Sequence, residues 1–111
     1  MFPFKTALNS STLLPFNLNI VEQVAYINRS SVGIVHVNDC PDDANRETIM
    51  DKDRVFPGDG ILPSKKFAQL LDGIGYNGFL SLELSIEHFE HQSALNVATY
   101  GLNKIKEAYS I

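Results

Sequence analysis

Hydrophobic and polar positions alternate along the chain in blocks that predict helices and strands in turn. Residues 18–28 are predicted to be helical because Ile20, Val24 and Ile27 are spaced four and three residues apart, which places them on one helix face. The apolar, β-branched run at residues 32–37 predicts a strand that is covered on both faces. The chain therefore opens with a helix followed by a buried strand.

A second helix, a second strand and a third helix follow in the same way. Pro63 suits the first turn of the second helix, where its missing N–H is harmless. A run of alternating side chains at residues 79–84 predicts the second strand, and residues 93–109 predict the last helix. The apolar stripe of the second helix is Phe67, Leu70, Leu71 and Ile74, and that of the last helix is Leu95, Ala98, Leu102, Ile105 and Tyr109.

The two predicted strands are separated by a long polar stretch, residues 38–62, which is rich in Asp, Pro and Gly. A short helical turn is predicted near residues 46–50. Loops longer than about 12–15 residues are uncommon in compact domains and tend to be functional. Strands that alternate with helices pair in parallel through right-handed crossovers, so the pattern predicts an α/β fold with parallel strands. In such folds the functional face lies at the carboxyl ends of the strands.

Length and composition narrow the possible functions. A complete (β/α)₈ barrel needs about 250 residues, or about 31 for each βα unit, so 111 residues hold about three units. The net charge of −4 disfavours a nucleic-acid partner, which needs a basic face. No stretch approaches the length of a membrane span, and no signal peptide is recognisable, so we expect no membrane contact. The single cysteine, Cys40, fits a reducing compartment and hence a cytoplasmic location.

Two polar residues stand out within the predicted strands. Glu83 lies near the carboxyl end of the second strand, on the face of Phe79 and Ser81, and a carboxylate on a buried strand is costly unless it is paired or binds a metal. His36 lies near the carboxyl end of the first strand, on the face of Ile34. Neutral imidazole is a common metal ligand. The alternative for either residue alone is a polar side chain that is satisfied at a strand end.

Three motifs carry a resemblance to a known family. The chain resembles the xylose isomerase-like TIM barrels, the sugar phosphate isomerase/epimerase superfamily that includes inosose isomerase and dehydratase relatives. The resemblance extends from about residue 21 to residue 84, and the last helix is compatible with it. The motifs are HVND at residues 36–39, DRVFPGDG at residues 53–60 and GYNGFLSLEL at residues 75–84.

The resemblance implies roles for three residues. His36 matches the metal-binding His of the family's seventh strand, and Glu83 matches the Glu of the eighth strand, which also serves as acid or base. Arg54 matches the arginine that contacts substrate oxygens. The implied cofactor is a divalent Mn, Mg, Co or Zn ion, and the implied reaction is proton transfer next to a carbonyl of a sugar, sugar phosphate or cyclitol. The alternative for Arg54 is a surface salt bridge to Asp51 or Asp53.

The beginning of the chain departs from the family. Two further metal ligands, an Asp and a Glu, belong to the preceding strands, but no acidic residue occurs before Glu22. We therefore divide the chain into a divergent segment, residues 1–17, and the carboxyl-terminal part of a barrel, residues 18–111, which is the last two to three βα units. Two alternatives follow: a catalytically inactive remnant, or a fragment that needs a partner chain. Exposed sheet edges and apolar surface predict self-association.

Other groups of polar residues give weaker signals. The segment at residues 87–91 contains two Glu and two His, but a solvated polar face explains it better than a metal site. Cys40 lacks a neighbouring cation that would activate its thiol, so we expect it to be inert. Several Asp residues of the long loop have a spacing that is not that of an EF-hand calcium loop. They are Asp39, Asp42, Asp43 and Asp59.

Overall fold

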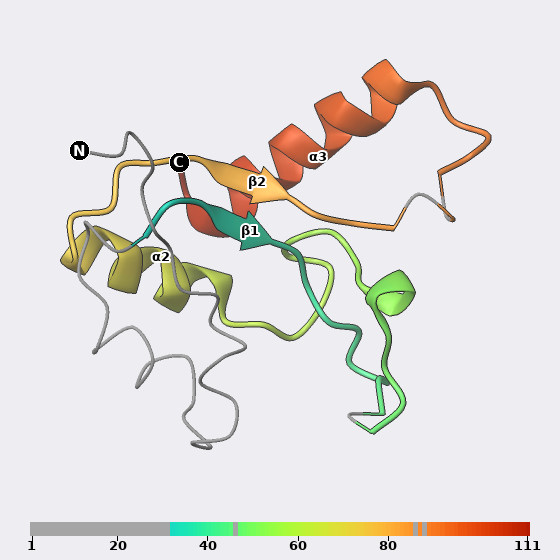
Figure 1. Ribbon diagram of the computed structural model, residues 1–111, viewed down its shortest axis with the longest axis horizontal. Coiled ribbons are helices and arrows are strands. Elements are labelled where there is room, and N and C mark those ends of the chain that lie inside the picture. The colour runs from blue at the N-terminus through green and yellow to red at the C-terminus, as the bar shows by residue number, and fades with distance from the viewer. Residues whose placement is uncertain (1–31, 46, 86, 88) are drawn as a thin grey trace, which may run out of the picture.

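A computed structural model describes residues 32–111 apart from residues 46, 86 and 88 (Figure 1). Within these residues the elements in chain order are β1 (Val35–Val37), the 3₁₀ helix η3 (Asp51–Asp53), α2 (Ser64–Gly73), β2 (Leu80–Leu82) and α3 (Ala94–Tyr109). The predicted helix at residues 18–28 and the division at residue 17 lie outside the described residues. The predicted order of strand, long loop, helix, strand and helix is confirmed.

The two strands pair in parallel, as predicted. Val35 is opposite Leu80, His36 opposite Ser81 and Val37 opposite Leu82. Both strands are shorter than predicted: β1 covers residues 35–37 instead of 32–37, and β2 covers residues 80–82 instead of 79–84. β1 ends at Val37 as predicted and is shorter only at its beginning. β2 ends at Leu82 because its partner strand ends at Val37, and one further hydrogen bond, from Glu83 N–H to the Val37 carbonyl at 3.1 Å, extends the pairing.

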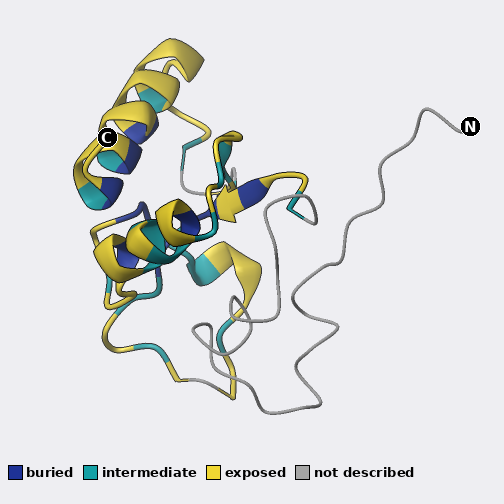
Figure 2. Ribbon diagram, turned by 90° about the vertical axis from the view of Figure 1, so that its left-hand side faces the viewer, coloured by how far each residue is buried: buried dark blue, intermediate teal, exposed yellow. Residues whose placement is uncertain are grey.

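Both helices pack against one face of the sheet, which we call the outer face. Its side chains join residues of α2 and α3 in one cluster, and Figure 2 shows the buried residues on the sides of the elements that face one another. Burial of apolar surface in this layer is the main stabilising contribution, at roughly 25 cal/mol for each Å² removed from water. The buried cluster is Val35, Val37, Leu71, Ile105 and Tyr109.

The α2 helix follows the sequence pattern closely. It begins directly after Pro63 and ends at Gly73, and Leu71 is buried. Phe67 and Ile74 pack against the buried cluster, although Ile74 lies one residue beyond the helix end. The predicted apolar stripe is therefore the one that faces the sheet.

The predicted stripe of α3 is wrong in its first half. Leu95 is 74% exposed and Leu102 is 52% exposed, whereas Gly101, Ile105 and Tyr109 are buried. The helix is rotated because it approaches β2 at Gly101: a Cβ atom there would lie 2.5 Å from Cδ2 of Leu82. A glycine contributes no hydrophobic signal to the sequence, so the closest contact between helix and strand was invisible in the pattern.

The long loop contains one short helix that the sequence did not predict. This 3₁₀ helix, η3, covers residues 51–53. The helical turn predicted near residues 46–50 corresponds to a single hydrogen-bonded turn, in which the Thr48 and Ile49 amides donate to the Asn45 carbonyl. The loop is fixed to the end of β1 by an antiparallel bridge between Asp39 and Val55. This bridge determines where Arg54 lies.

Candidate active site at the carboxyl ends of the strands

The structure brings His36 and Glu83 together. His36 lies in the middle of β1, and its side chain points away from the face of Val35 and Val37 that the helices cover. Glu83 follows β2 directly. Nδ1 of His36 is 3.2 Å from Oε2 of Glu83, and both side chains are about half exposed. Residues 47 positions apart in the sequence are therefore in contact, because parallel pairing places both strand ends at the same edge.

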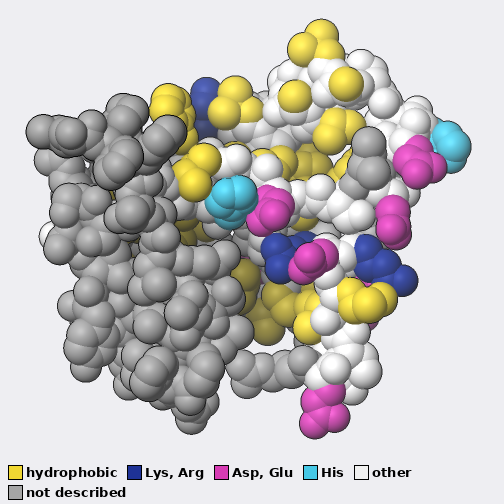
Figure 3. All heavy atoms as spheres, viewed as in Figure 1, with side chains coloured by type: hydrophobic (Ala, Val, Ile, Leu, Met, Phe, Trp, Pro, Cys, Tyr) yellow, Lys and Arg dark blue, Asp and Glu magenta, His cyan; other side chains and the backbone are white. Residues whose placement is uncertain are grey.

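Arg54 joins this pair from the long loop. Its Nη1 atom is 3.7 Å from Oε2 of Glu83, and its Nη2 atom donates a hydrogen bond of 2.6 Å to Asp51. The salt bridge to Asp51 that was the alternative for Arg54 is therefore present, and the same guanidinium also reaches the strand ends. Figure 3 shows His, acidic and basic side chains side by side on this face of the molecule.

Asn38 is a neighbour of the site that the sequence reasoning missed. Its side-chain amide lies 3.4 Å from the backbone carbonyl of Glu83, to which it donates a hydrogen bond. The contact ties the end of β1 to the residue that follows β2. The sequence signal was available, because Asn38 directly follows β1 within the HVND motif.

Asp39 is the second missed residue, and it is not a calcium ligand. Its side chain is 1% exposed, and its carboxylate accepts hydrogen bonds from the backbone amides of Cys40, Gly58 and Leu62 at 2.8–2.9 Å. A buried charge is tolerated when it is hydrogen-bonded in this way. The carboxylate therefore organises the long loop from within.

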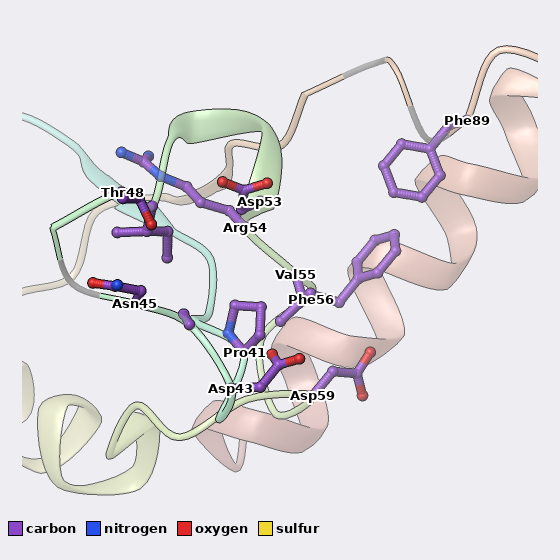
Figure 4. Close-up of a pocket in the computed structure, with 12 residues that line it drawn as sticks. Pro41, Asp43, Asn45, Thr48, Asp53, Arg54, Val55, Phe56, Asp59 and Phe89 are labelled. Atoms are coloured by element: carbon purple, nitrogen blue, oxygen red, sulfur yellow. The ribbon is translucent and has the colours of Figure 1, made fainter.

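A pocket of about 680 Å³ lies on the loop side of Arg54 (Figure 4). Arg54, Asp53 and Thr48 line one part of it, and Phe56 and Phe89 line another. The rings of Phe56 and Phe89 meet edge to face with centroids 5.3 Å apart. Its volume is within the usual range for small-molecule sites. The pocket thus combines aromatic surface with hydrogen-bonding groups next to the arginine.

One ion pair attaches the far end of the long loop to α3. Lys104 Nζ is 2.5 Å from Oδ1 of Asp59, and this hydrogen bond raises the pKa of Lys104 above its ordinary value. Near the end of the same helix, burial raises the pKa of the Tyr109 hydroxyl. Both groups lie on the outer side of the fold, away from His36 and Glu83.

The remaining candidates do not form a site. Among the described residues no group of three or more His, Cys, Asp or Glu side chains could hold one metal ion. Glu87, Glu90 and His91 are exposed, and His88 lies outside the described residues. The Cys40 thiol donates to the neighbouring Pro41 carbonyl. No helix in the described part of the chain is long and apolar enough to cross a membrane.

The profile of the xylose isomerase-like TIM barrel family matches residues 11–107, nearly the whole chain. The chain belongs to this family. The match includes both strands, the long loop and most of α3. It confirms the family that the three motifs indicated, and it identifies the sheet as part of a TIM barrel.

Two solved structures share the fold. One is the crystal structure of the IolI protein with a bound zinc atom, with a TM-score of 0.67 and 23% identity over 95% of this chain. The other is a xylose isomerase domain-containing protein from Salmonella typhimurium LT2, with a TM-score of 0.72 and 20% identity over 98% of this chain. The chain spans only 38% and 40% of these two proteins. No curated protein sequence gives a significant match.

The barrel assignment explains the two faces of the sheet. In a TIM barrel the helices cover the outside of the strands, and active sites lie at the carboxyl ends of the strands. The outer face with α2 and α3 corresponds to the outside. The opposite face, which we call the inner face, corresponds to the barrel interior and bears His36. The His36–Glu83–Arg54 cluster thus occupies the position in which barrel enzymes carry their chemistry.

Proposed function

We propose that the chain supplies part of the active site of a divalent-metal-dependent isomerase or epimerase. The substrate is a sugar, a sugar phosphate or a cyclitol, and the reaction is proton transfer next to a carbonyl. The observation that carries the proposal is the contact of His36 with Glu83 at the strand ends, with Arg54 beside them. The family resemblance and this geometry support their proposed roles as metal ligand, base and substrate-binding residue.

The spacing of His36 and Glu83 fits a metal ion. Two ligand atoms about 2.0–2.1 Å from one zinc ion in a tetrahedral arrangement are about 3.3 Å apart. The separation of His36 Nδ1 and Glu83 Oε2, 3.2 Å, agrees with this value. Imidazole and carboxylate are also ligands that Zn²⁺ and Mn²⁺ accept. A bound divalent ion would polarise the carbonyl and hydroxyl oxygens of the substrate.

The protein side chains carry the proton and orient the substrate. The Glu83 carboxylate removes a proton from the hydroxyl-bearing carbon next to the carbonyl and returns it to the former carbonyl carbon, while the hydroxyl proton passes to the former carbonyl oxygen. Arg54 binds substrate oxygens through its planar guanidinium, whose several N–H donors suit oxygen acceptors. Because Arg54 also lines the pocket, the end of the substrate that does not react extends toward Phe56 and Phe89.

A second candidate is a chain that works only with a partner chain, or an inactive remnant. One observation favours it. No third metal-binding side chain joins His36 and Glu83 within the described residues, whereas catalytic zinc sites use three protein ligands. In this case the remaining ligands come from a separate polypeptide.

Hydrogen–deuterium exchange of the substrate tests the first candidate. The chain is incubated in D₂O with Mn²⁺ and a ketose, a ketose phosphate or an inosose, and deuterium at the carbon next to the carbonyl is measured by mass spectrometry. We expect exchange that falls at least about a hundredfold in Glu83→Gln, the usual contribution of a general base. The matched control, Glu87→Gln, removes an exposed carboxylate after the same strand and retains the exchange.

The outcomes separate the two candidates. Exchange that persists in Glu83→Gln contradicts the assignment of Glu83 as the base. No exchange with any of the three substrates favours the second candidate, and adding the amino-terminal part of a homologous barrel as a separate polypeptide then tests whether activity is restored.

A further inference from the structure

We propose that Asp39 is a positioning residue that holds Arg54 at the strand ends by fixing the long loop from within. The proposal deepens the proposed function and rests on it for the role of Arg54. Asp39 does not reach His36 or Glu83 in this role. It acts through the backbone of the loop, and it is one of the most buried charged groups in the described part of the chain, at 1% exposure.

Asp39 uses its backbone and its side chain together. Its amide donates to the Val55 carbonyl at 2.8 Å, and its carbonyl accepts from the Val55 amide at 3.1 Å. Its Oδ1 accepts from Cys40 and Leu62, and its Oδ2 accepts from Gly58. One residue thus fixes three separate points of the loop, at positions 55, 58 and 62. Hydrogen bonds to a charged acceptor are about twice as strong as those between neutral groups.

The loop closes tightly around this carboxylate. A Cβ atom at Gly60 would lie 2.5 Å from Oδ1 of Asp39 and 2.1 Å from the Cys40 carbonyl oxygen. That carbonyl accepts the Ile61 amide at 3.0 Å. Only glycine fits between the two groups, so the loop can pass this close to the Asp39 carboxylate only because residue 60 has no side chain.

The consequence for the active site comes through position 55. The bridge of Asp39 with Val55 places the preceding residue, Arg54, beside the residues that follow the histidine-bearing strand, although Arg54 comes 17 positions after Val37 in the sequence. From this position its Nη1 atom lies 3.7 Å from Oε2 of Glu83. The exposed ion pair with Asp51 does not set this position, because Asp51 belongs to the same loop and moves with it.

Asp39→Asn keeps the backbone bridge to Val55 and weakens only the side-chain contacts that hold the rest of the loop, with little change in shape. An amide has one acceptor oxygen where the carboxylate has two, so its NH₂ group faces a backbone N–H of the loop whichever way it is oriented. The matched control is Asp59→Asn, a change in the same loop that removes a carboxylate paired with Lys104 and not with the loop backbone.

The test measures the chemical reactivity of the Arg54 guanidinium in the 111-residue chain, without metal or substrate. Phenylglyoxal modifies accessible guanidinium groups, and the modified Arg54 peptide is quantified by mass spectrometry. We expect Asp39→Asn to raise the modification rate of Arg54 at least threefold at a temperature where the variant is folded, and Asp59→Asn to leave it unchanged. In the deuterium assay, Asp39→Asn lowers the rate as Arg54→Ala does, and the double variant shows no further loss.

A wild-type measurement keeps the proposal testable if Asp39→Asn does not fold. The Gly58 and Leu62 amides lie outside the helices and strands, yet we expect them to exchange with solvent at least tenfold more slowly than those of exposed residues 42 and 43. Unprotected Gly58 and Leu62 amides overturn the proposal. So does a folded Asp39→Asn variant whose only change is a lower melting temperature, with Arg54 reactivity as in the wild type. If the chain catalyses no deuterium exchange into the substrate, that result contradicts the proposed function. The Arg54 reactivity and the amide exchange rates still test the role of Asp39.

Discussion

The two faces of the sheet differ in what covers them. On the outer face Val35 and Val37 are 8% and 1% exposed and pack against α2 and α3. On the inner face Ile34 is 52% exposed and Phe79 is 83% exposed. The two strands and the residues next to them therefore bury one side against helices and expose apolar side chains and the half-exposed His36 on the other. In a complete barrel, layers of side chains from the other strands fill this inner space.

The residues that stabilise the fold and the residues of the candidate site lie on different sides of the sheet. Residues that hold the fold together lie on the outer face, where burial contributes free energy. His36, Glu83 and Arg54 lie at the strand ends on the opposite side, where their side chains remain partly exposed to solvent. Substitutions on the two faces should therefore have opposite consequences, and the following experiments use that difference.

The largest expected effect is the loss of stability when the outer face is truncated. Val37→Ala removes two buried carbon atoms and leaves a small cavity, so we expect it to lower the free energy of unfolding by about 2 kcal/mol. Phe79→Ala removes a much larger side chain from the inner face and should cost less than about 0.5 kcal/mol at a protein concentration at which the chain is monomeric. Urea denaturation of both variants measures the difference. A greater loss in Phe79→Ala would mean that the inner face is covered.

The exposed inner face also predicts self-association of the isolated chain. We expect sedimentation analysis to show an oligomer, or a monomer of marginal stability, because apolar side chains and unpaired strand edges are both accessible. Phe79→Ser should weaken the association at least tenfold, which corresponds to about 1.4 kcal/mol. Leu95→Ser, on the exposed side of α3, serves as the control for a general loss of surface hydrophobicity. A cooperative monomer with more than about 5 kcal/mol of stability contradicts the incomplete-barrel account.

The smallest expected effect concerns the ion pair of Lys104 and Asp59, which fixes the loop to α3. The pKa of Lys104 in the folded chain is raised above its ordinary value of 10.5 by the hydrogen bond to Asp59. The stabilisation is therefore complete below this value and is lost as the pH rises through the raised pKa. Because Asp59 is 40% exposed, Lys104→Met should cost no more than about 1 kcal/mol at neutral pH. Urea denaturation of the wild type and Lys104→Met at pH 7 and pH 11 measures this loss of stability. An equal loss at both pH values would exclude the ion pair as its cause.

Local patterns predicted much of the fold and the central pair of the site. Alternation along the strands placed His36 and Glu83 on one face, and parallel pairing placed their strand ends together, because both rules depend only on spacing. The buried stripe of α3 could not be predicted, because its closest contact is at Gly101, which has no side chain. Asp39 was missed for a different reason. Its partners at Gly58 and Leu62 are backbone amides 19 and 23 residues away, and a backbone donor leaves no signature in the sequence.

The most direct test of the central claim locates a paramagnetic ion on the chain. Substoichiometric Mn²⁺ is added to ¹⁵N-labelled protein, and the broadening of each backbone amide signal is measured by NMR. We expect weak Mn²⁺ binding, with broadening centred on His36 and Glu83 and extending to Arg54, and loss of this broadening in His36→Ala. Broadening centred on residues 87–91, or on the acidic residues 42 and 43 of the long loop, would contradict it.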